Sequence, residues 1–459
     1  MNKYITVFSL VFTFWLASCK EVLQPRPIDI LADQFVLNEA KDVQPVRIGA
    51  YSAFRSTAAP KVIVGDFTAD YIQHNGTFTD YQELGNKQIT SANGVASALW
   101  GSIYNTIYVC NFLLEKLPSV PGVREAERKS VIAEARFLRG MANFMGATTF
   151  GGIPKVTTTD VAANRNIPRA SREEILASAL EDFQAALTDL PAGSPTQGRP
   201  VFAGYATKNA ARAAMARFYL YQKDWQKAEE MATAVINTNQ YNLVNYVEVV
   251  GRDFNAESIF EVGYTAFDDP GTSTFGLNNI LVGRREVIPS NQFITQILQR
   301  DSGERRATVS FNANNQRGGD NGWTVRKYGT ADEDNNNIVI FRLGEMYLIR
   351  AEARAQQGRI TGANGALADI NVLRERAGRN ITQEANKPTL VAAATQAQTL
   401  LIIEQERLYE LSFEGHRWYD LLRTGRVKAV LGVDKKAFMP VFYTELMLNP
   451  NLLPQNPGY

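Results

Sequence analysis

Segments rich in alanine and other small residues recur along this chain of 459 residues, each long enough for a pair of helices. In residues 206–237, an alanine-rich run is followed by a polar turn at residues 222–224 and by a second run that starts at Trp225. Small side chains on one helix allow a second helix to pack closely against it. Residues 100–150 and 343–377 repeat this arrangement. The chain is therefore predicted to be mainly α-helical and built from helix pairs.

The three helix pairs resemble tetratricopeptide repeats, which stack into a superhelical scaffold. A further helix is expected over residues 172–190. Three long polar stretches, residues 66–96, 264–282 and 312–337, are expected to be irregular loops with only minor β elements. Loops of this length are uncommon without a purpose. Because loops on a rigid scaffold often carry function, we expect them to bind a ligand.

The first 18 residues have the pattern of a lipoprotein signal peptide. A basic start is followed by an apolar run over residues 4–16, which is too short to span a bilayer but suits a signal sequence. Residues 16–19 fit a bacterial lipobox, so cleavage is expected before Cys19, with lipid attached to Cys19. Several acyl chains form a stable anchor, and Lys20 in place of Asp favours the outer membrane. The alternative is an ordinary secretory signal in which Cys19 is coincidental.

The mature chain, residues 19–459, is expected to form one domain with no net charge. The full chain has a formal charge of +1, and removal of residues 1–18 deletes Lys3 and no acidic residue, which leaves 0. A neutral chain argues against nucleic acid as a partner and favours neutral glycans or peptides. Cys110 is the only thiol left after lipidation, so no intramolecular disulfide is expected.

Residues 396–425 are predicted to form an amphipathic helix near the C-terminus. Glu406, Glu410 and Glu414 are four residues apart and would share one stripe of it. Like charges on one stripe repel, and the nearby Arg407, Arg417 and Arg423 are expected to neutralise them. The carboxylates could form a general acid and base pair, or a structural network of salt bridges. We favour the network, because a catalytic pair needs a cleft and shifted pKa values.

The same stretch resembles the C-terminal signature of the SusD/RagB family. The positions that match the signature are Glu406, Arg407, Glu410, Leu411, Phe413, Glu414, Gly415, Arg417, Asp420, Leu421, Arg423 and Gly425. Residues 133–139 and 150–154 also resemble blocks of this family. The resemblance implies a SusD-like fold and a lipoprotein on the outside of the outer membrane. It also implies that the chain binds oligosaccharides or peptides without chemistry and delivers them to a SusC-like TonB-dependent transporter.

Sequence motifs for catalysis or for metal binding are missing from the chain. It has no His-Glu-x-x-His, Gly-x-Ser-x-Gly, Walker or Gly-x-Gly-x-x-Gly motif. His74 and His416 are the only histidines. Residues 332–343 miss two key positions of a calcium loop. We therefore expect no catalytic residue, no metal and no cofactor, although a surface glycoside hydrolase or peptidase with Asp/Glu pairs and a protein-binding repeat adaptor remain alternatives.

Two of the predicted loops offer the residue types that bind sugars. A sugar needs an apolar ring face for its C–H groups and amides or carboxylates for its hydroxyls. Peptides could use the same groups, and the aromatic rings could instead cover the core. Trp100 and Trp323 are expected to belong to the core. The candidate ligand-binding residues are Asp66, Tyr71, His74, Phe78 and Tyr81 in the first loop and Phe267, Phe275 and Asn278 in the second.

Overall fold

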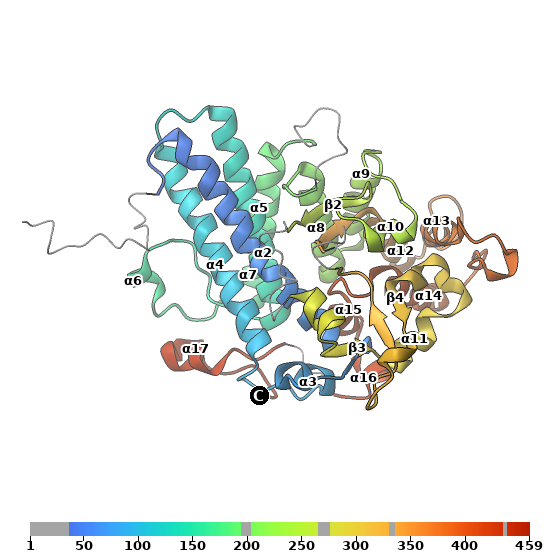
Figure 1. Cartoon of the computed structure of the whole chain (residues 1–459). Coiled ribbons are helices and arrows are strands. Elements are labelled where there is room, and N and C mark those ends of the chain that lie inside the picture. Colours follow the sequence, from blue (N-terminus) through green and yellow to red (C-terminus); the bar gives the residue numbers. More distant parts are fainter. Residues whose placement is uncertain (1–35, 194–202, 265–275, 330–335, 435–437) are drawn as a thin grey trace, which may run out of the picture.

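The computed structural model describes residues 36–193, 203–264, 276–329, 336–434 and 438–459, and they are mainly helical (Figure 1). The longer α-helices are α2 (Val43–Phe67), α3 (Thr79–Asn86), α4 (Gly94–Lys116), α5 (Glu125–Phe150), α7 (Arg172–Asp189), α8 (Lys208–Gln222), α9 (Trp225–Ile236), α12 (Leu343–Gln356), α13 (Ala366–Gly378), α14 (Gln396–Leu411) and α15 (Arg417–Thr424). The shorter ones are α6 (Val161–Asn164), α10 (Tyr246–Gly251), α11 (Asn291–Ile297), α16 (Val427–Leu431) and α17 (Tyr443–Leu448). The described residues also form the π-helix η6 (Asn279–Gly283) and short 3₁₀-helices. The 3₁₀-helices are η3 (Ala40–Asp42), η4 (Leu117–Ser119), η7 (Arg300–Thr308), η8 (Ala313–Asn315), η9 (Glu384–Asn386) and η10 (Pro450–Leu452).

The three predicted helix pairs are present as α4 with α5, α8 with α9, and α12 with α13. Helix α7, which was also predicted, packs between α5 and α8, and α9 packs on α12, so that each helix of this series contacts the next. Side chains that cap the first turn determine where several of these helices start. The Asn93 side chain accepts the N–H groups of Val95 and Ala96 at the start of α4, and Ser171 forms a capping box with Glu174 at the start of α7.

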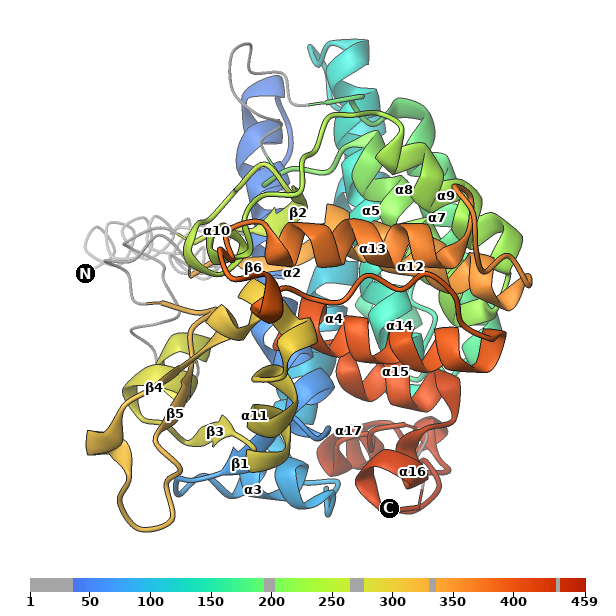
Figure 2. The ribbon, with the colours of Figure 1, turned by 90° about the vertical axis from the view of Figure 1, so that its right-hand side faces the viewer.

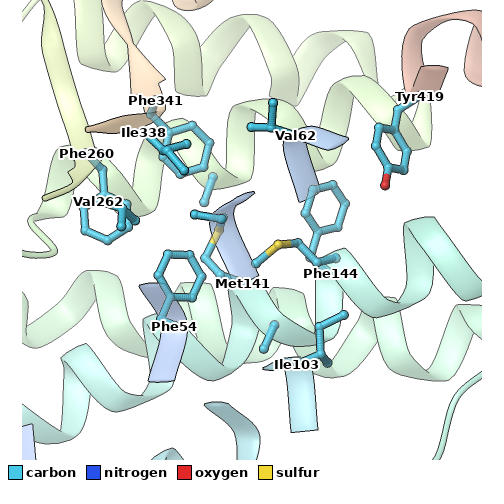
Figure 3. Packing of buried hydrophobic residues seen from close by; sticks show 14 of the residues in the cluster. Phe54, Val62, Ile103, Met141, Phe144, Phe260, Val262, Ile338, Phe341 and Tyr419 are labelled. Carbon is cyan, nitrogen blue, oxygen red and sulfur yellow. The ribbon is translucent and has the colours of Figure 1, made fainter. Parts of the chain in front are cut away.

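The hydrophobic core lies where the N-terminal helices meet a small sheet. Figure 3 shows Phe54 and Met141 on one side and Phe260 and Phe341 on the other. The rings of Phe54 and Phe260 are 5.8 Å apart, and both side chains are buried. Burying a side chain of this size stabilises the fold by about 1.5–3 kcal/mol. Trp100 is also buried in α4, as predicted.

Three two-stranded antiparallel sheets occur in the described part of the chain. Strand β1 (Ile72–His74) pairs with β3 (Val287–Pro289), β2 (Ser258–Val262) pairs with β6 (Ile338–Arg342), and β4 (Val309–Phe311) pairs with β5 (Trp323–Val325). The minor β elements expected in the loops at residues 66–96 and 312–337 are present as β1 and β5, whereas the helix α3 within residues 66–96 was not expected.

The C-terminal signature forms two helices, so the single helix expected over residues 396–425 is wrong. Helix α14 ends at Leu411, and α15 starts at Arg417. Between them Gly415 has φ of +80°, a conformation that favours glycine. The turn packs directly on α2, where a Cβ added at Gly65 would lie 2.3 Å from the Gly415 carbonyl oxygen.

Alanine substitutions at two glycines of α2 should change stability in opposite directions. Gly65→Ala should lower the free energy of unfolding by about 1–3 kcal/mol, because the added methyl overlaps the backbone of the α14–α15 turn. Gly49→Ala should raise it by about 0.5–1 kcal/mol, because nothing lies within 4 Å of its added Cβ and alanine favours a helix. Urea denaturation measures both values. Equal effects of the two substitutions would contradict the close contact at Gly65.

Candidate functional site

The three signature glutamates lie in a buried network of ion pairs. Glu406 accepts hydrogen bonds from Arg305 and Arg374, both at 2.6 Å. Glu410 accepts one from Arg342 Nη1 at 2.6 Å and one from Arg376. The Glu414 carboxylate is paired with Arg342 and with Lys327, and Glu257 bridges Arg342 and Arg376. These contacts favour the interpretation of the three glutamates as a network of salt bridges over that of a catalytic pair.

The electrostatics of these carboxylates also argue against acid catalysis. Burial acts to raise the pKa of Glu410, but Arg376, Arg342 and Arg305 outweigh it and hold the pKa well below its usual range. The pKa of Glu414 is lowered in the same way, by Arg342 and Lys327 against the effect of burial. A general acid needs a raised pKa. These groups stay ionised and bind the C-terminal signature to the segments around residues 257, 305 and 342.

The arginines of the signature have other partners than predicted. Arg407 and Arg423 both pair with Asp420, at 2.7 and 2.8 Å, and Arg423 also pairs with Glu352. Arg417 makes a bidentate pair with Asp70, at 2.8 and 2.9 Å. The prediction that Arg407, Arg417 and Arg423 neutralise the three glutamates is therefore wrong. Geometry decides the pairing, since Arg417 and Arg423 lie on α15, after the turn that ends α14, and Arg407 directly follows Glu406 and so points to another side of α14.

Several of the candidate ligand-binding residues are buried. The Asp66 carboxylate accepts the N–H of Gly415 at 2.7 Å and that of Arg417 at 3.3 Å, and burial raises the pKa of Asp66 to about 7. The Tyr71 ring packs on Phe293 and Phe413. Tyr81 is 2% exposed and packs on Phe67 and Phe78. Asp66, Tyr71 and Tyr81 are buried here, which argues against their predicted contact with a ligand and favours the alternative in which the aromatic rings cover the core.

The other candidate ligand-binding residues differ in how far they are exposed. His74 and Phe78 are half-buried, and the guanidinium of Arg284 lies 4.7 Å from the centre of the Phe78 ring. Asn278 is 7% exposed and precedes η6. Phe267, Phe275 and the lipidation residue Cys19 lie outside the described residues. Ligand contact by His74, Phe78, Asn278, Phe267 and Phe275 stays a prediction.

The β4–β5 hairpin presents aromatic rings at the surface, and it projects at the lower left of Figure 2. Phe311 of β4 and Trp323 of β5 are directly opposite each other in the register, and their rings are 5.3 Å apart. Phe311 is 51% exposed, and Trp323 is half-buried. Gly322 has φ of +80° and lies against the Phe311 ring, where a Cβ would be 2.7 Å from a ring carbon. The exposed amides Asn314 and Gln316 lie in the connecting turn.

A polar cluster fixes this hairpin to the β1–β3 sheet. Arg285 donates to both carboxylate oxygens of Asp320, at 2.6 and 3.1 Å, and to the carbonyl of Trp323 at 3.0 Å. Asn75 donates to Asp320 at 3.1 Å and to the carbonyl of Arg285 at 3.0 Å. We call Asn75, Arg285, Phe311, Asp320 and Trp323 the hairpin site. The main chain of the hairpin is held at Trp323 and Asp320 by groups that already have partners, so the site is preorganised.

Sequence reasoning found only part of the hairpin site. Asn75 lies in the first predicted loop, but Trp323 was assigned to the core, and Phe311, Arg285 and Asp320 were not singled out. The sequence nevertheless contains a signal for this hairpin. The segment Gly318-Gly319-Asp320-Asn321-Gly322 lies between two aromatic residues, and such glycine and asparagine clusters between short apolar runs indicate a hairpin.

A second aromatic hollow lies at the start of the other predicted loop. Tyr264 lines a cavity of about 320 Å³ together with Tyr51 and Tyr205. The Tyr51 and Tyr205 rings meet edge to face, with 5.0 Å between their centres. The Tyr51 hydroxyl lies 2.9 Å from Glu134 and donates to it.

Within the residues that the structure describes, no group of three or more His, Cys, Asp or Glu side chains is placed to hold a metal ion. No helix in the same ranges is both long and apolar enough to span a membrane. Cys110 is buried as a free thiol in α4.

Comparisons with known proteins agree with the C-terminal signature. One family model, described as the SusD family, matches residues 303–436, and another, described as "Starch-binding associating with outer membrane", matches residues 31–220. SusD-like protein P38 of Formosa agariphila is 25% identical over 98% of this chain and 98% of its own length. A SusD-like protein of Bacteroides ovatus is 23% identical over 75% of this chain and 68% of its own length.

Solved structures share the fold. A SusD superfamily protein from Bacteroides thetaiotaomicron superposes with a TM-score of 0.77 at 24% identity, covering 91% of this chain and all of that one. A laminarin-binding SusD-like protein superposes with a TM-score of 0.74 at 23% identity, covering 92% of this chain and all of its own. With the intact signature from Glu406 to Gly425, both family models and the relatives that match nearly end to end, the chain belongs to the SusD/RagB family.

Proposed function

We propose that the mature chain is a lipid-anchored surface protein that captures oligosaccharides at the hairpin site and delivers them to a SusC-like TonB-dependent transporter. The pair of rings at Phe311 and Trp323 is the observation that carries the proposal. The description of one matching family as starch-binding and the laminarin-binding neighbour support a glycan ligand. The lipobox at Cys19, outside the described residues, supports an anchor on the outer membrane.

The chemistry of the hairpin site fits a neutral sugar. The Phe311 and Trp323 rings offer apolar faces for C–H groups, and the exposed amides Asn314 and Gln316 can exchange hydrogen bonds with hydroxyls. Arg285 and Asp320 neutralise each other, so this pair gives the site no net charge.

Binding fits this site better than hydrolysis. Burial acts to raise the pKa of Asp320, but hydrogen bonds from Arg285 and Gly322 outweigh it and lower the pKa. The nearby Glu286 has a lowered pKa too, because the N–H groups of Phe78 and Thr77 and the Arg284 guanidinium outweigh burial. Glycoside hydrolysis needs a carboxyl that carries a proton. Neither carboxyl meets that need.

Loss of either ring should weaken glycan binding. We expect Phe311→Ala and Trp323→Ala each to reduce affinity for the best-binding oligosaccharide about tenfold, because each removes one stacking surface. Calorimetric titration with soluble oligosaccharides, including laminarin fragments, and with peptides measures this. Tyr443→Ala is the matched control, since Tyr443 is also exposed, at 46%, but lies in α17.

Unchanged affinity in both folded ring variants would contradict the hairpin site. Hydrolysis of a bound glycan by the wild type would support the alternative hypothesis that the protein is a glycoside hydrolase. Co-purification from membranes tests delivery separately: the proposal expects a large TonB-dependent barrel to be retained with the wild type.

A further inference from the structure

The four most exposed large hydrophobic side chains of the described residues lie in two short segments. Leu448 is 78% exposed, Val161 75%, Met447 74% and Leu453 56%. Met447 and Leu448 belong to α17, and no residue of this fully described helix is buried. Val161 is the first residue of α6. We call these four side chains the α17 patch, and exposed apolar side chains gathered in this way mark a surface that meets a partner.

Hydrogen bonds join the two segments of the α17 patch and fix them to the rest of the molecule. The Asn449 side chain donates to the carbonyl of Ile167 at 2.9 Å, and the Asn451 side chain donates to the carbonyl of Asn166 at 2.8 Å. The first N–H of α17 donates to the carbonyl of Ser91, just before α4, at 2.9 Å. A fixed backbone thus presents the apolar side chains, which lowers the entropy cost of binding a partner.

The α17 patch lies on the same side of the molecule as the hairpin site. Figure 1 and Figure 2 share their vertical axis, and in both views α17 and α3 lie at the bottom of the molecule. The β4–β5 hairpin extends to the bottom in both views as well. A partner that covers this side would therefore contact apolar side chains at one end and enclose a glycan on Phe311 and Trp323 at the other.

A barrel that takes up the glycan fits this side better than a bilayer or a second copy of the chain. A bilayer or a second copy on this side would cover the hairpin site, and a lipid surface offers no path for a sugar. A transporter, in contrast, has to meet the protein on the side where the glycan is held. Protein interfaces of this kind are centred on apolar side chains.

The segment before the described residues is long enough for this orientation. The chain enters at the other end of α4 from α17, where a Cβ added at Gly122 would lie 3.8 Å from Ala40. With 23 residues, α4 is about 34 Å long. Residues 20–35 reach at most about 58 Å. Lipid on Cys19 can therefore lie in the same membrane as a barrel that the α17 patch faces.

We propose that the α17 patch is the surface by which this chain docks on its outer-membrane barrel, with Met447 and Leu448 packed on apolar side chains of the loops around the barrel's opening. The inference rests on the proposed function, because it assigns a surface to the delivery step. It also sets the orientation of the complex, in which the hairpin site opens toward the barrel.

Co-purification from detergent-solubilised outer membranes tests the docking surface, with the retained barrel identified by mass spectrometry. The full chain with Leu448→Asp should retain at least tenfold less barrel than the wild type, because a charge would lie in the apolar centre of the interface. Leu448→Met, which keeps the volume and the apolar character, should retain the barrel. Leu401→Asp is the matched control, since Leu401 is also exposed, at 54%, but lies on α14.

Calorimetric titration with oligosaccharide separates failure of docking from failure of capture. Leu448→Asp should bind oligosaccharide as tightly as the wild type. Equal retention of the barrel by the wild type and Leu448→Asp, or equal losses in Leu448→Asp and Leu401→Asp, would overturn the docking surface and leave delivery standing. A wild type that retains no barrel would contradict delivery itself and the docking surface with it.

Two further outcomes would show that another occupant covers the α17 patch. Purified Cys19→Ser protein, which carries no lipid, should not bind vesicles of phosphatidylethanolamine and phosphatidylglycerol. Vesicle binding that Leu448→Asp abolishes would identify a lipid surface as the occupant and overturn the proposal. A Cys19→Ser dimer that Leu448→Asp converts to a monomer would overturn it in favour of a second copy of the chain.

Discussion

Replacing Glu410 with alanine should lower the free energy of unfolding by about 3–5 kcal/mol. The carboxylate is fully buried and lies between Arg342 and Arg376, with Arg305 at 3.5 Å. Removing it leaves three buried guanidinium groups with fewer counter-charges, and the protein cannot hydrate them without opening its core. Urea denaturation followed by circular dichroism measures the change.

An exposed ion pair provides the control for this prediction. Glu384 pairs with Lys387 at 2.8 Å, but 84% of its side chain is exposed. Exposed pairs contribute little, so Glu384→Ala should leave the midpoint of denaturation unchanged. A Glu410→Ala protein as stable as the wild type would show that the buried network does not hold the signature in place.

Glu261→Gln should make the protein more stable than the wild type at alkaline pH. Glu261 is 2% exposed, and its carboxylate accepts the N–H of Phe254 at 2.9 Å. Burial raises the pKa of Glu261 to about 8, with a contribution from Asp253. In contrast to Glu410, this glutamate is not part of the arginine network, so its charge is costly in the folded state.

The sign of this pH dependence follows from the raised pKa. Below the usual pKa of a glutamate, 4.5, both states bind the proton and Glu261 costs nothing. Between pH 4.5 and about 8 the unfolded chain releases the proton while the folded one keeps it, so the wild type loses stability as the pH rises. The loss is on the order of 5 kcal/mol over this window. The glutamine variant has no such loss.

Denaturation of both proteins from pH 5 to pH 9 measures this difference. The free energy of unfolding of Glu261→Gln, taken relative to the wild type, should rise steadily up to about pH 8 and then level off. Parallel stability curves would mean that Glu261 keeps an ordinary pKa in the fold. Glu410 should behave oppositely, since its lowered pKa makes its contribution disappear only in acid.

The helix pairs could be predicted because their signals are local. Alanine-rich runs, caps such as Asp224 before α9 and the left-handed Lys223 that ends α8 act over a few residues. The family signature could be recognised for the same reason, since it is one continuous stretch. Its break at Gly415 was missed, although a glycine inside a helical pattern is itself a local signal for a helix end; the close approach of this turn to Gly65 of α2 could not be predicted, because Gly65 is far away in sequence.

The ion pairs of the signature could not be predicted, because their partners come from distant segments. Arg342 is 68 residues from Glu410, and Arg305 is 101 residues from Glu406. The arginines nearest in sequence turn to other acids, such as Asp70 and Glu352. Spacing along one helix indicates which residues share a face, but not which element covers that face.

The same limit applies to the candidate binding residues. Tyr71 and Phe311 have similar neighbours in sequence, yet Tyr71 is 1% exposed and Phe311 is 51% exposed. What separates them is tertiary packing: Tyr71 lies between Phe293 and Phe413, whereas Phe311 is in a two-stranded hairpin whose outer side stays open. An aromatic residue in a polar stretch therefore suggests binding only once its exposure is known.

A crystal structure of the mature protein with its best-binding oligosaccharide would show where the sugar binds. We expect a sugar ring stacked on Phe311 and Trp323, with hydroxyl groups bonded to Asn314 or Gln316 and with Arg285 and Asp320 unmoved. A sugar bound instead in the hollow of Tyr51, Tyr205 and Tyr264 would contradict the hairpin site.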